Sequence, residues 1–373
     1  MLEYVRETGE AGSIKMSNQK TVHYNMDEID KVGANFNLIW GERSNGKSYQ
    51  VKHKKAIEKY LKTGKRFILM RRWKEEISTE KIESYFADVD IHKLTKGEYN
   101  CVVPYRKVLY LAYYDTETGK TTKGDKIGYV VALSTEQNYA GGSYLDVEDI
   151  IFEEFMARGS YIPNEPSKLM NFYCTVDRKR GTTRVWMVGN TISRVCPYLS
   201  EWDLQKTIST QKQGTIKTVE QISDDGEKIL LAIEYCKSTG ASSHTIGTHA
   251  KMLNDGSWQT DPQPHLPKSY NEYEVRYRVG FSFKGFKFIG EFLTDRVCDV
   301  WFIYPYEREF KNILVISDEI RPDKFYQRDI YNVTIKNPML HMILDTFRET
   351  NIFYSTDLCG TDFKQAIDFA IRK

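Results

Sequence analysis

The first candidate for chemistry in this sequence is an eight-residue glycine-rich segment that fits the pattern G-x-x-x-x-G-K-[ST]. Its members are Gly41, Glu42, Arg43, Ser44, Asn45, Gly46, Lys47 and Ser48. Glycines let such a loop bend until its backbone N–H groups converge on an anion, and a following helix adds its positive end. Lys47 then contacts the β and γ phosphates, and the Ser48 hydroxyl binds Mg²⁺. The segment predicts an ATP and Mg²⁺ site, with an ordinary glycine turn as the alternative.

Two adjacent acids, Glu153 and Glu154, follow the apolar residues 150–152. At the end of a strand in a phosphate-binding domain, the first acid can hold Mg²⁺ through a water molecule. The second can polarise the attacking water as a general base. The alternative is a pair of solvated acids at a strand end. The position of the pair favours hydrolysis of ATP over binding alone.

The basic loop at residues 174–184, CTVDRKRGTTR, offers a positive charge for the γ-phosphate in the transition state. Arg178 is the preferred candidate because the loop could reach the site of a neighbouring subunit. Arg180 and Arg184 are the alternatives, and a solvated basic cluster is the competing interpretation. Asn190 and Thr191 end the next apolar run, where a polar side chain can sense the γ-phosphate.

The elements that must position these residues are short apolar runs, typical of strands buried on both faces of a mostly parallel sheet. The runs are residues 35–40, 66–72, 129–134, 149–155 and 184–190. Between the first two, helical spacing of apolar residues predicts a helix that ends at Gly64. The predicted class of this ATPase domain, residues 34–204, is therefore α/β.

A hairpin is predicted within residues 101–128. Its tip carries Lys120, Lys123 and Lys126, which could contact nucleic acid, although a solvated turn is the alternative. Residues 1–33 are polar and are expected to form a loose lead-in. Residues 205–266 are rich in Ser, Thr, Gly, Lys and Gln and are expected to form a linker or small subdomain, with a helix near 229–237.

A second domain is predicted over residues 267–373. Its sequence alternates like antiparallel strands over 274–293 and 300–306, and helical patterns follow at 338–350 and 361–373. The expected class of this domain is α+β.

Composition limits the environment and the partners. The formal net charge is only +2, so a basic surface for nucleic acid must be local. The six cysteines stand singly, which favours buried free thiols in a reducing compartment. No apolar run approaches the roughly 20 residues of a membrane span, and the N-terminus has no apolar signal core. A cytoplasmic protein without a membrane partner is expected.

Three longer stretches carry a resemblance to one family. Residues 161–180 (YIPNEPSKLMNFYCTVDRKR), 66–76 (RFILMRRWKEE) and 188–199 (VGNTISRVCPYL) resemble the terminase-like, double-stranded DNA packaging ATPases of small podophages of the Bacillus and Lactococcus phage type. The resemblance implies a homomeric ring, expected to be a pentamer, at the portal vertex of a procapsid in the infected host cytoplasm. It also implies a P-loop ASCE (RecA-like) ATPase domain, a C-terminal domain like a degenerate RNase-H-like nuclease, and a packaging RNA as a candidate partner.

The resemblance assigns roles to individual positions. Gly41, Gly46, Lys47 and Ser48 correspond to the phosphate and Mg²⁺ ligands, and Glu153 and Glu154 to the metal-binding acid and the catalytic base. Arg178 corresponds to an arginine finger that acts on the neighbouring subunit. Lys74 corresponds to a second basic position near the subunit interface, where Arg180 is also expected. The family's lysine before the acid pair has no counterpart, because Ala140 stands near that place.

The strands at residues 271–293 should carry the first of the acids with which larger packaging enzymes hold two metals. Lys284 and Lys287 stand where Asp is expected, so no DNA cleavage is predicted. These lysines could contact DNA phosphates or a scaffold at the vertex, although a solvated strand face is the alternative.

Three hypotheses follow. The first is an ATP-driven translocase for double-stranded DNA, whose contacts must be to phosphates and not to base edges. The second is a helicase or other ATPase stimulated by single strands, which would use aromatic stacking. The third is a nucleotide-binding ring component that does not hydrolyse ATP, and Glu154 argues against it.

Overall fold

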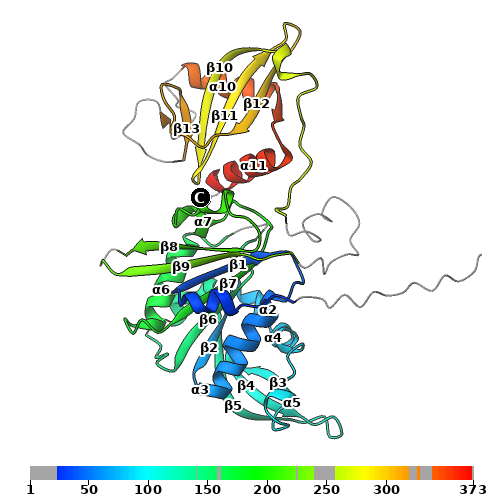
Figure 1. Cartoon of the computed structure of the whole chain (residues 1–373), viewed down its shortest axis with the longest axis vertical. Coiled ribbons are helices and arrows are strands. Elements are labelled where there is room, and N and C mark those ends of the chain that lie inside the picture. The colour runs from blue at the N-terminus through cyan, green and yellow to red at the C-terminus, as the bar shows by residue number, and fades with distance from the viewer. Residues whose placement is uncertain are drawn as a thin grey trace, which may run out of the picture.

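We describe the protein from a computed structural model, covering residues 23–139, 141–157, 161–223, 226–238, 257–318, 326–327 and 338–371. The described part of the chain forms two sheets, each covered by helices, with α11 (Asp357–Ile371) lying between them (Figure 1). No helix among the described residues is both long and apolar enough to cross a bilayer.

The first sheet has nine strands in the order β3-β4-β5-β2-β6-β7-β1-β9-β8. Its six central strands, from β5 to β9, pair in parallel, which confirms the predicted sheet. The apolar runs form these strands because both of their faces are covered. The central strands are β5 (Thr121–Ala132), β2 (Arg66–Arg71), β6 (Val147–Glu153), β7 (Arg184–Asn190), β1 (Phe36–Gly41) and β9 (Lys228–Tyr235).

Strand register brings the predicted chemistry to one edge of this sheet. Gly41, which ends β1, pairs with Asn190, which ends β7. Glu153 ends β6 and pairs with Val188 of β7. Because parallel strands end at a common edge, the glycine-rich loop, the acid pair and Asn190 meet there.

Helices cover both faces of this sheet. One face carries α1 (Asp27–Val32), the helix after the glycine-rich loop and α4 (Thr79–Phe86), and their buried residues join a core cluster with Ile39 and Leu69. The other face carries α6 (Glu165–Asp177) and α7 (Pro197–Glu201), whose cluster includes Leu38 and Trp40. Strand residues of β1 therefore alternate between two cores.

The helix after the glycine-rich loop runs from Lys47 to Thr63. It begins as α2 (Lys47–Val51), widens into the π-helical η1 (Lys52–Glu58) and closes as α3 (Lys59–Thr63). Gly64 ends it in the left-handed conformation, with φ of 71°, and its N–H donates to the Tyr60 carbonyl. The predicted helix and its C-cap are confirmed, whereas the π-helical turns were not predicted.

Short elements and an antiparallel extension complete this side of the molecule. The predicted hairpin is confirmed, since β4 pairs antiparallel with both β3 and β5. The remaining elements are η2 (Lys74–Glu76), α5 (Ile91–Leu94), β3 (Cys101–Tyr105), β4 (Val108–Tyr114) and η3 (Leu133–Tyr139).

The linker predicted at 205–266 is wrong over most of its described residues. After the short helix α8 (Gln205–Ser209), β8 (Thr215–Ile222) pairs antiparallel with β9, and β9 pairs in parallel with β1. The helix predicted near 229–237 is thus a strand, because a short apolar run buried on both faces has no helical or strand period. Residues 239–256 lie outside the described part of the chain.

The prediction of a loose lead-in at residues 1–33 is also wrong for residues 23–33, the part of this segment that the structure describes. Met26 and Ile29 are fully buried in the cluster that covers β1, and the Tyr24 N–H donates to the carbonyl of Asn45 in the glycine-rich loop at 2.9 Å. Of the cysteines, Cys196, Cys236 and Cys359 are buried, but Cys174 and Cys298 are exposed and Cys101 is half-buried. The expectation of buried thiols holds for three of the six.

The second sheet has six strands in the order β14-β13-β10-β11-β12-β15. The predicted strands pair antiparallel and the two predicted helices form, α10 packing with α11 through Ile343 and Phe363 against one sheet face. The elements are η4 (Tyr270–Glu272), β10 (Glu274–Phe283), β11 (Phe286–Thr294), β12 (Asp299–Pro305), β13 (Val315–Ser317), β14 (Tyr326–Gln327), α10 (Pro338–Glu349) and β15 (Asn351–Tyr354).

Candidate ATP and magnesium site

The glycine-rich loop encloses the ammonium group of Lys47. Gly46 has φ of 95°, a left-handed conformation that glycine adopts without strain, and it leads directly into α2. Lys47 Nζ donates to the carbonyl oxygen of Glu42, to Asn45 Oδ1 at 3.1 Å and to Asn190 Oδ1 at 3.3 Å. Burial lowers the pKa of Lys47, opposed by nearby acids such as Glu153. A bound triphosphate can replace these oxygens as the hydrogen-bond partner of the buried Lys47 ammonium group.

Glu153 and Ser48 form the other half of the site. Ser48 Oγ donates to Glu153 Oε2 at 2.9 Å, and the hydroxyl of Tyr85 donates to Glu153 Oε1 at 2.8 Å. Burial raises the pKa of Glu153, and the two hydrogen bonds oppose that rise. A hydroxyl and a carboxylate side by side are oxygen ligands of the kind that Mg²⁺ takes, directly or through water. The residues present fit the predicted Mg²⁺ ion.

Glu154 lies in a different environment from Glu153. Its backbone is left-handed, with φ of 57°, and its side chain is 62% exposed. Arg71, the last residue of β2, places Nη2 3.3 Å from Glu154 Oε2. The exposure fits a general base, because the carboxylate of Glu154 is accessible to a water molecule.

A buried ion pair behind the acids was missed by sequence reasoning. Arg72 Nε donates to both carboxylate oxygens of Glu165, at 3.0 and 2.9 Å. Arg72 Nη1 and Nη2 donate to the carbonyls of Glu154 and Phe155 at 3.0 and 2.7 Å. Tyr198 donates to Glu165 at 2.9 Å. The motif YIPNE around Glu165 was a usable signal, since a glutamate that opens an apolar helix can be a buried partner.

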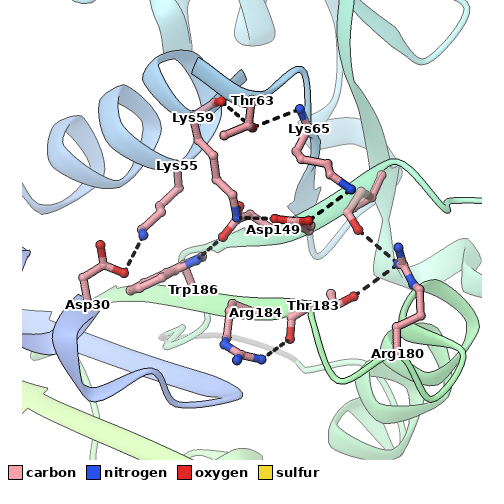
Figure 2. Close-up of polar contacts among 12 residues, drawn as sticks. Asp30, Lys55, Lys59, Thr63, Lys65, Asp149, Arg180, Thr183, Arg184 and Trp186 are labelled. Carbon is pink, nitrogen blue, oxygen red and sulfur yellow. Dashed lines mark hydrogen bonds and ion pairs between the residues drawn. The ribbon is translucent and has the colours of Figure 1, made fainter. Parts of the chain in front are cut away.

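The three candidate arginines do different things. Arg180 donates to five backbone carbonyls, those of Tyr144, Leu145, Val147, Val176 and Asp177, and Arg184 donates to the carbonyls of Gly181 and Thr183. Figure 2 shows both beside Thr183, at the edge where Asp149 binds Lys59 and Trp186. Arg180 thus has a structural role within the chain, and the interface role expected for it stays a prediction.

Arg178 is the exposed arginine of the three. It caps α6 in the left-handed conformation, with φ of 49°, and its Nη2 donates to the Gly142 carbonyl at 2.7 Å. It precedes β7, so it lies near the edge where the parallel strands begin. A seven-residue strand spans roughly 20 Å, and an arginine side chain cannot bridge that length. Arg178 therefore lies too far from Lys47 to serve the same subunit's phosphates.

The predicted nucleic-acid lysines do not form one cluster. Lys120 is exposed after the β4–β5 turn, and Lys123 Nζ lies 3.5 Å from the centre of the Tyr105 ring. Lys287 pairs with Glu309. Lys284 pairs with Asp318 at 3.2 Å, and its carbonyl accepts from Ser200 and Gln205 of the first sheet's domain. Lys284 thus belongs to a contact within the chain.

Two interface expectations remain open predictions. Lys74 is exposed at the start of η2. Ala140, where the resemblance expects a lysine, lies outside the described residues.

The chain is similar to a family of phage proteins. Residues 18–224 match the model of the family described as Podovirus DNA encapsidation protein (Gp16), which is more than half of the chain. The DNA packaging proteins of Bacillus phages PZA and B103 are 32% identical over 188 residues and 33% identical over 181 residues. These matches cover 50% and 46% of this chain and 51% and 49% of those proteins, so the chain spans about half the length of the curated relatives it matches.

Two solved structures are similar to the chain. The crystal structure of the N-terminal domain of the bacteriophage phi29 DNA packaging ATPase is 29% identical, covers 56% of this chain and 95% of that chain, and has a TM-score of 0.42. A chain of the bacteriophage phi29 genome packaging motor assembly is 22% identical, covers 94% and 99%, and superposes with a TM-score of 0.57. The second likeness shows a shared fold over both sheets. The chain belongs to the Podovirus DNA encapsidation protein (Gp16) family.

Proposed function

We propose that this chain is the ATPase subunit of a motor that translocates double-stranded DNA into a viral procapsid. The observation that carries the proposal is the joint position of Lys47, Ser48, Glu153 and Asn190 at one sheet edge. A domain that only binds nucleotide needs the loop, whereas hydrolysis also needs acids beside it. DNA packaging is the function named for the matched relatives.

In this proposal the chain's own residues divide the work between binding and catalysis. Lys47 and the loop amides hold the β and γ phosphates, and Asn190 contacts the same phosphate end. Ser48 and Glu153 hold Mg²⁺, which neutralises charge on the phosphate oxygens when it is bound. Glu154 accepts the proton of the attacking water, and Arg72 holds the backbone carbonyl of Glu154 from behind.

We further propose that Arg178 completes the site of a neighbouring subunit in a ring, with five subunits expected. The support is geometric, because Arg178 lies near the opposite sheet edge from its own loop and is exposed. A trans-acting arginine makes hydrolysis depend on the neighbour. Lys74 is the second candidate for this interface.

The finer fold assignments are part of the proposal. One strand, β7, separates the loop strand β1 from the acid strand β6, which supports an ASCE, RecA-like ATPase domain. In the second sheet β10, β11 and β12 run antiparallel while β13 pairs in parallel with β10 and β14 with β13. This order supports a degenerate RNase-H-like domain. The portal vertex and a packaging RNA are the proposed partners at the assembly.

A second candidate, an ATPase stimulated by single strands, has one observation in its favour. Tyr105, Tyr113 and Tyr114 are exposed on the antiparallel extension, and Lys123 lies over the ring of Tyr105. Exposed aromatic rings beside lysines can stack bases. Stimulation of ATP turnover by duplex DNA and not by single strands would exclude this candidate.

The proposal is tested by steady-state ATP hydrolysis across protein concentration, with and without duplex DNA. We expect Arg178→Ala and Glu154→Gln each to lose at least about a hundredfold in turnover, the size of one missing catalytic group. A mixture of the two should regain activity, because a subunit with Glu154 can meet a neighbour with Arg178. Turnover that is independent of concentration and duplex DNA, with Arg178→Ala unaffected, would refute the ring motor.

A further inference from the structure

Tyr85 is the second hydrogen-bond partner of the acid that faces Ser48. Glu153 is 4% exposed, and its two carboxylate oxygens have separate donors, Ser48 on one side and Tyr85 on the other. Tyr85 comes from α4, which follows β2 and is far from the glycine-rich loop in sequence. The acid is thus held between two elements rather than by its own strand alone.

The tyrosine is itself held by the helix that carries Ser48. Lys52 lies one turn after Ser48 on that helix, with Nζ 4.6 Å from the centre of the Tyr85 ring. The same ammonium group donates to the Tyr85 carbonyl and pairs with Asp88. Lys52 is 4% exposed, and these contacts offset the free-energy cost of burying its ammonium group. The Phe86 ring meets the Tyr85 ring edge-on at 4.9 Å.

These contacts form a series that begins and ends on the long helix after the glycine-rich loop. It runs from Ser48 to Glu153, from Glu153 to Tyr85, and from Tyr85 to Lys52. The Tyr85 hydroxyl therefore occupies one carboxylate oxygen of Glu153 and leaves the other oxygen beside Ser48.

We propose that Tyr85 is a positioning residue for the Mg²⁺ site. Its hydroxyl orients Glu153 so that the carboxylate oxygen beside Ser48 faces the metal, and Lys52 anchors the tyrosine. This inference rests on the proposed ATP site. Without the hydroxyl, the carboxylate can rotate and must be reorganised when Mg²⁺ binds. The consequence is weaker metal binding without a matching loss of phosphate binding, because Lys47 and the loop amides are untouched.

The test is equilibrium binding of a fluorescent ATP analogue to the full chain while Mg²⁺ is titrated, which reads the metal site without hydrolysis. We expect Tyr85→Phe to raise the Mg²⁺ concentration for half-saturation roughly ten- to a hundredfold, the effect of losing one hydrogen bond that orients a metal-binding acid. Binding in EDTA should be unchanged. Tyr60→Phe is the matched control, because Tyr60 lies in α3, the end of the same long helix, and no change is expected there.

Lys52→Met is a second variant that tests the anchor. It should raise the Mg²⁺ half-saturation in the wild-type background and add nothing in the Tyr85→Phe background, since Lys52 acts through Tyr85. An equal effect of Lys52→Met in both backgrounds would overturn the role of Lys52.

Glu153→Gln separates this inference from the function on which it rests. If Glu153→Gln weakens Mg²⁺ binding but Tyr85→Phe matches Tyr60→Phe, the inference on Tyr85 is wrong and the proposed site stands. If Glu153→Gln leaves the Mg²⁺ dependence unchanged, the proposed metal site fails and the inference falls with it.

Discussion

At the scale of single residues, the site depends on charges that are buried in pairs. Arg72 and Glu165 have 4% and 0% of their side chains exposed. Arg72 also donates hydrogen bonds to the backbone carbonyls of Glu154 and Phe155. A buried ion pair adds little stability by itself, but removing one partner leaves an uncompensated charge. The pair therefore holds Glu154 in place and makes the loop sensitive to either residue.

Arg72→Met should lower the free energy of unfolding by about 3–5 kcal/mol, because Glu165 remains buried without its cation. The thermal midpoint measured by circular dichroism should fall by several degrees. Arg178→Met is the control: Arg178 is exposed, and the expected change is within about 0.5 kcal/mol. Arg72→Met with Glu165→Leu should recover part of the loss. A wild-type midpoint for Arg72→Met would show that the pair does not support the loop.

At the scale of elements, the long helix after the glycine-rich loop joins the phosphate site to α4. Its first residues carry Lys47 and Ser48, and its π-helical turns begin at Lys52. Widened turns of this kind are rare and occur often at functional sites. The end of the helix depends on Gly64, which lets the chain turn into β2.

Gly64→Ala should destabilise the protein by about 1 kcal/mol, because an L-residue is strained at φ of 71°. An added Cβ would meet nothing within 4 Å, so the effect is conformational and not steric. Gly64→Asn should cost less, since Asn tolerates the left-handed conformation better. Urea denaturation of the three proteins measures the order. Equal losses for Ala and Asn would contradict a conformational cause.

At the scale of the whole molecule, the loop after Asn190 connects the phosphate site to the second sheet's domain. Ser193 Oγ donates to Gln365 at 2.5 Å, and Arg194 Nε donates to Asp362 at 3.1 Å. Val195 joins the core cluster of that domain. The residues after Asn190, the proposed phosphate sensor, thus pack on α11, which lies between the two sheets (Figure 1).

Arg194→Met should loosen α11 from the loop, because Asp362 is 2% exposed and would lose its ion partner. Hydrogen exchange in α11 should become faster, while exchange in β1 should not change. Burial already raises the pKa of Asp362, and Arg194 opposes that rise.

The pH dependence of the variant follows from this shift. Loss of Arg194 raises the pKa of Asp362 further, and a buried acid with a raised pKa stabilises the fold least above that pKa. The protection of the α11 amides in the variant, taken relative to their intrinsic exchange rates at each pH, should therefore fall as the pH rises from about 4. Protection that does not depend on pH, or exchange equal to the wild type, would contradict the role of this ion pair.

The sequence by itself determined the glycine-rich loop, the acid pair, the central strands and the helix ending at Gly64. These features are local, since each depends on residue types at a fixed spacing along one segment. The same local reasoning could not find β9, whose apolar run has no period of its own and becomes a strand because β1 is beside it.

Only the tertiary structure decided which side chains support the site. Tyr85, Arg72 and Glu165 come from segments separated in sequence, and no local pattern shows that they meet behind the acid pair. The separate roles of Arg178 and Arg180 also required the fold, because a cluster of three arginines offers the same charge until the backbone carbonyls around each are known. A motif within one segment can be recognised in the sequence, whereas contacts between distant segments form only when burial of the core has selected one packing of the chain.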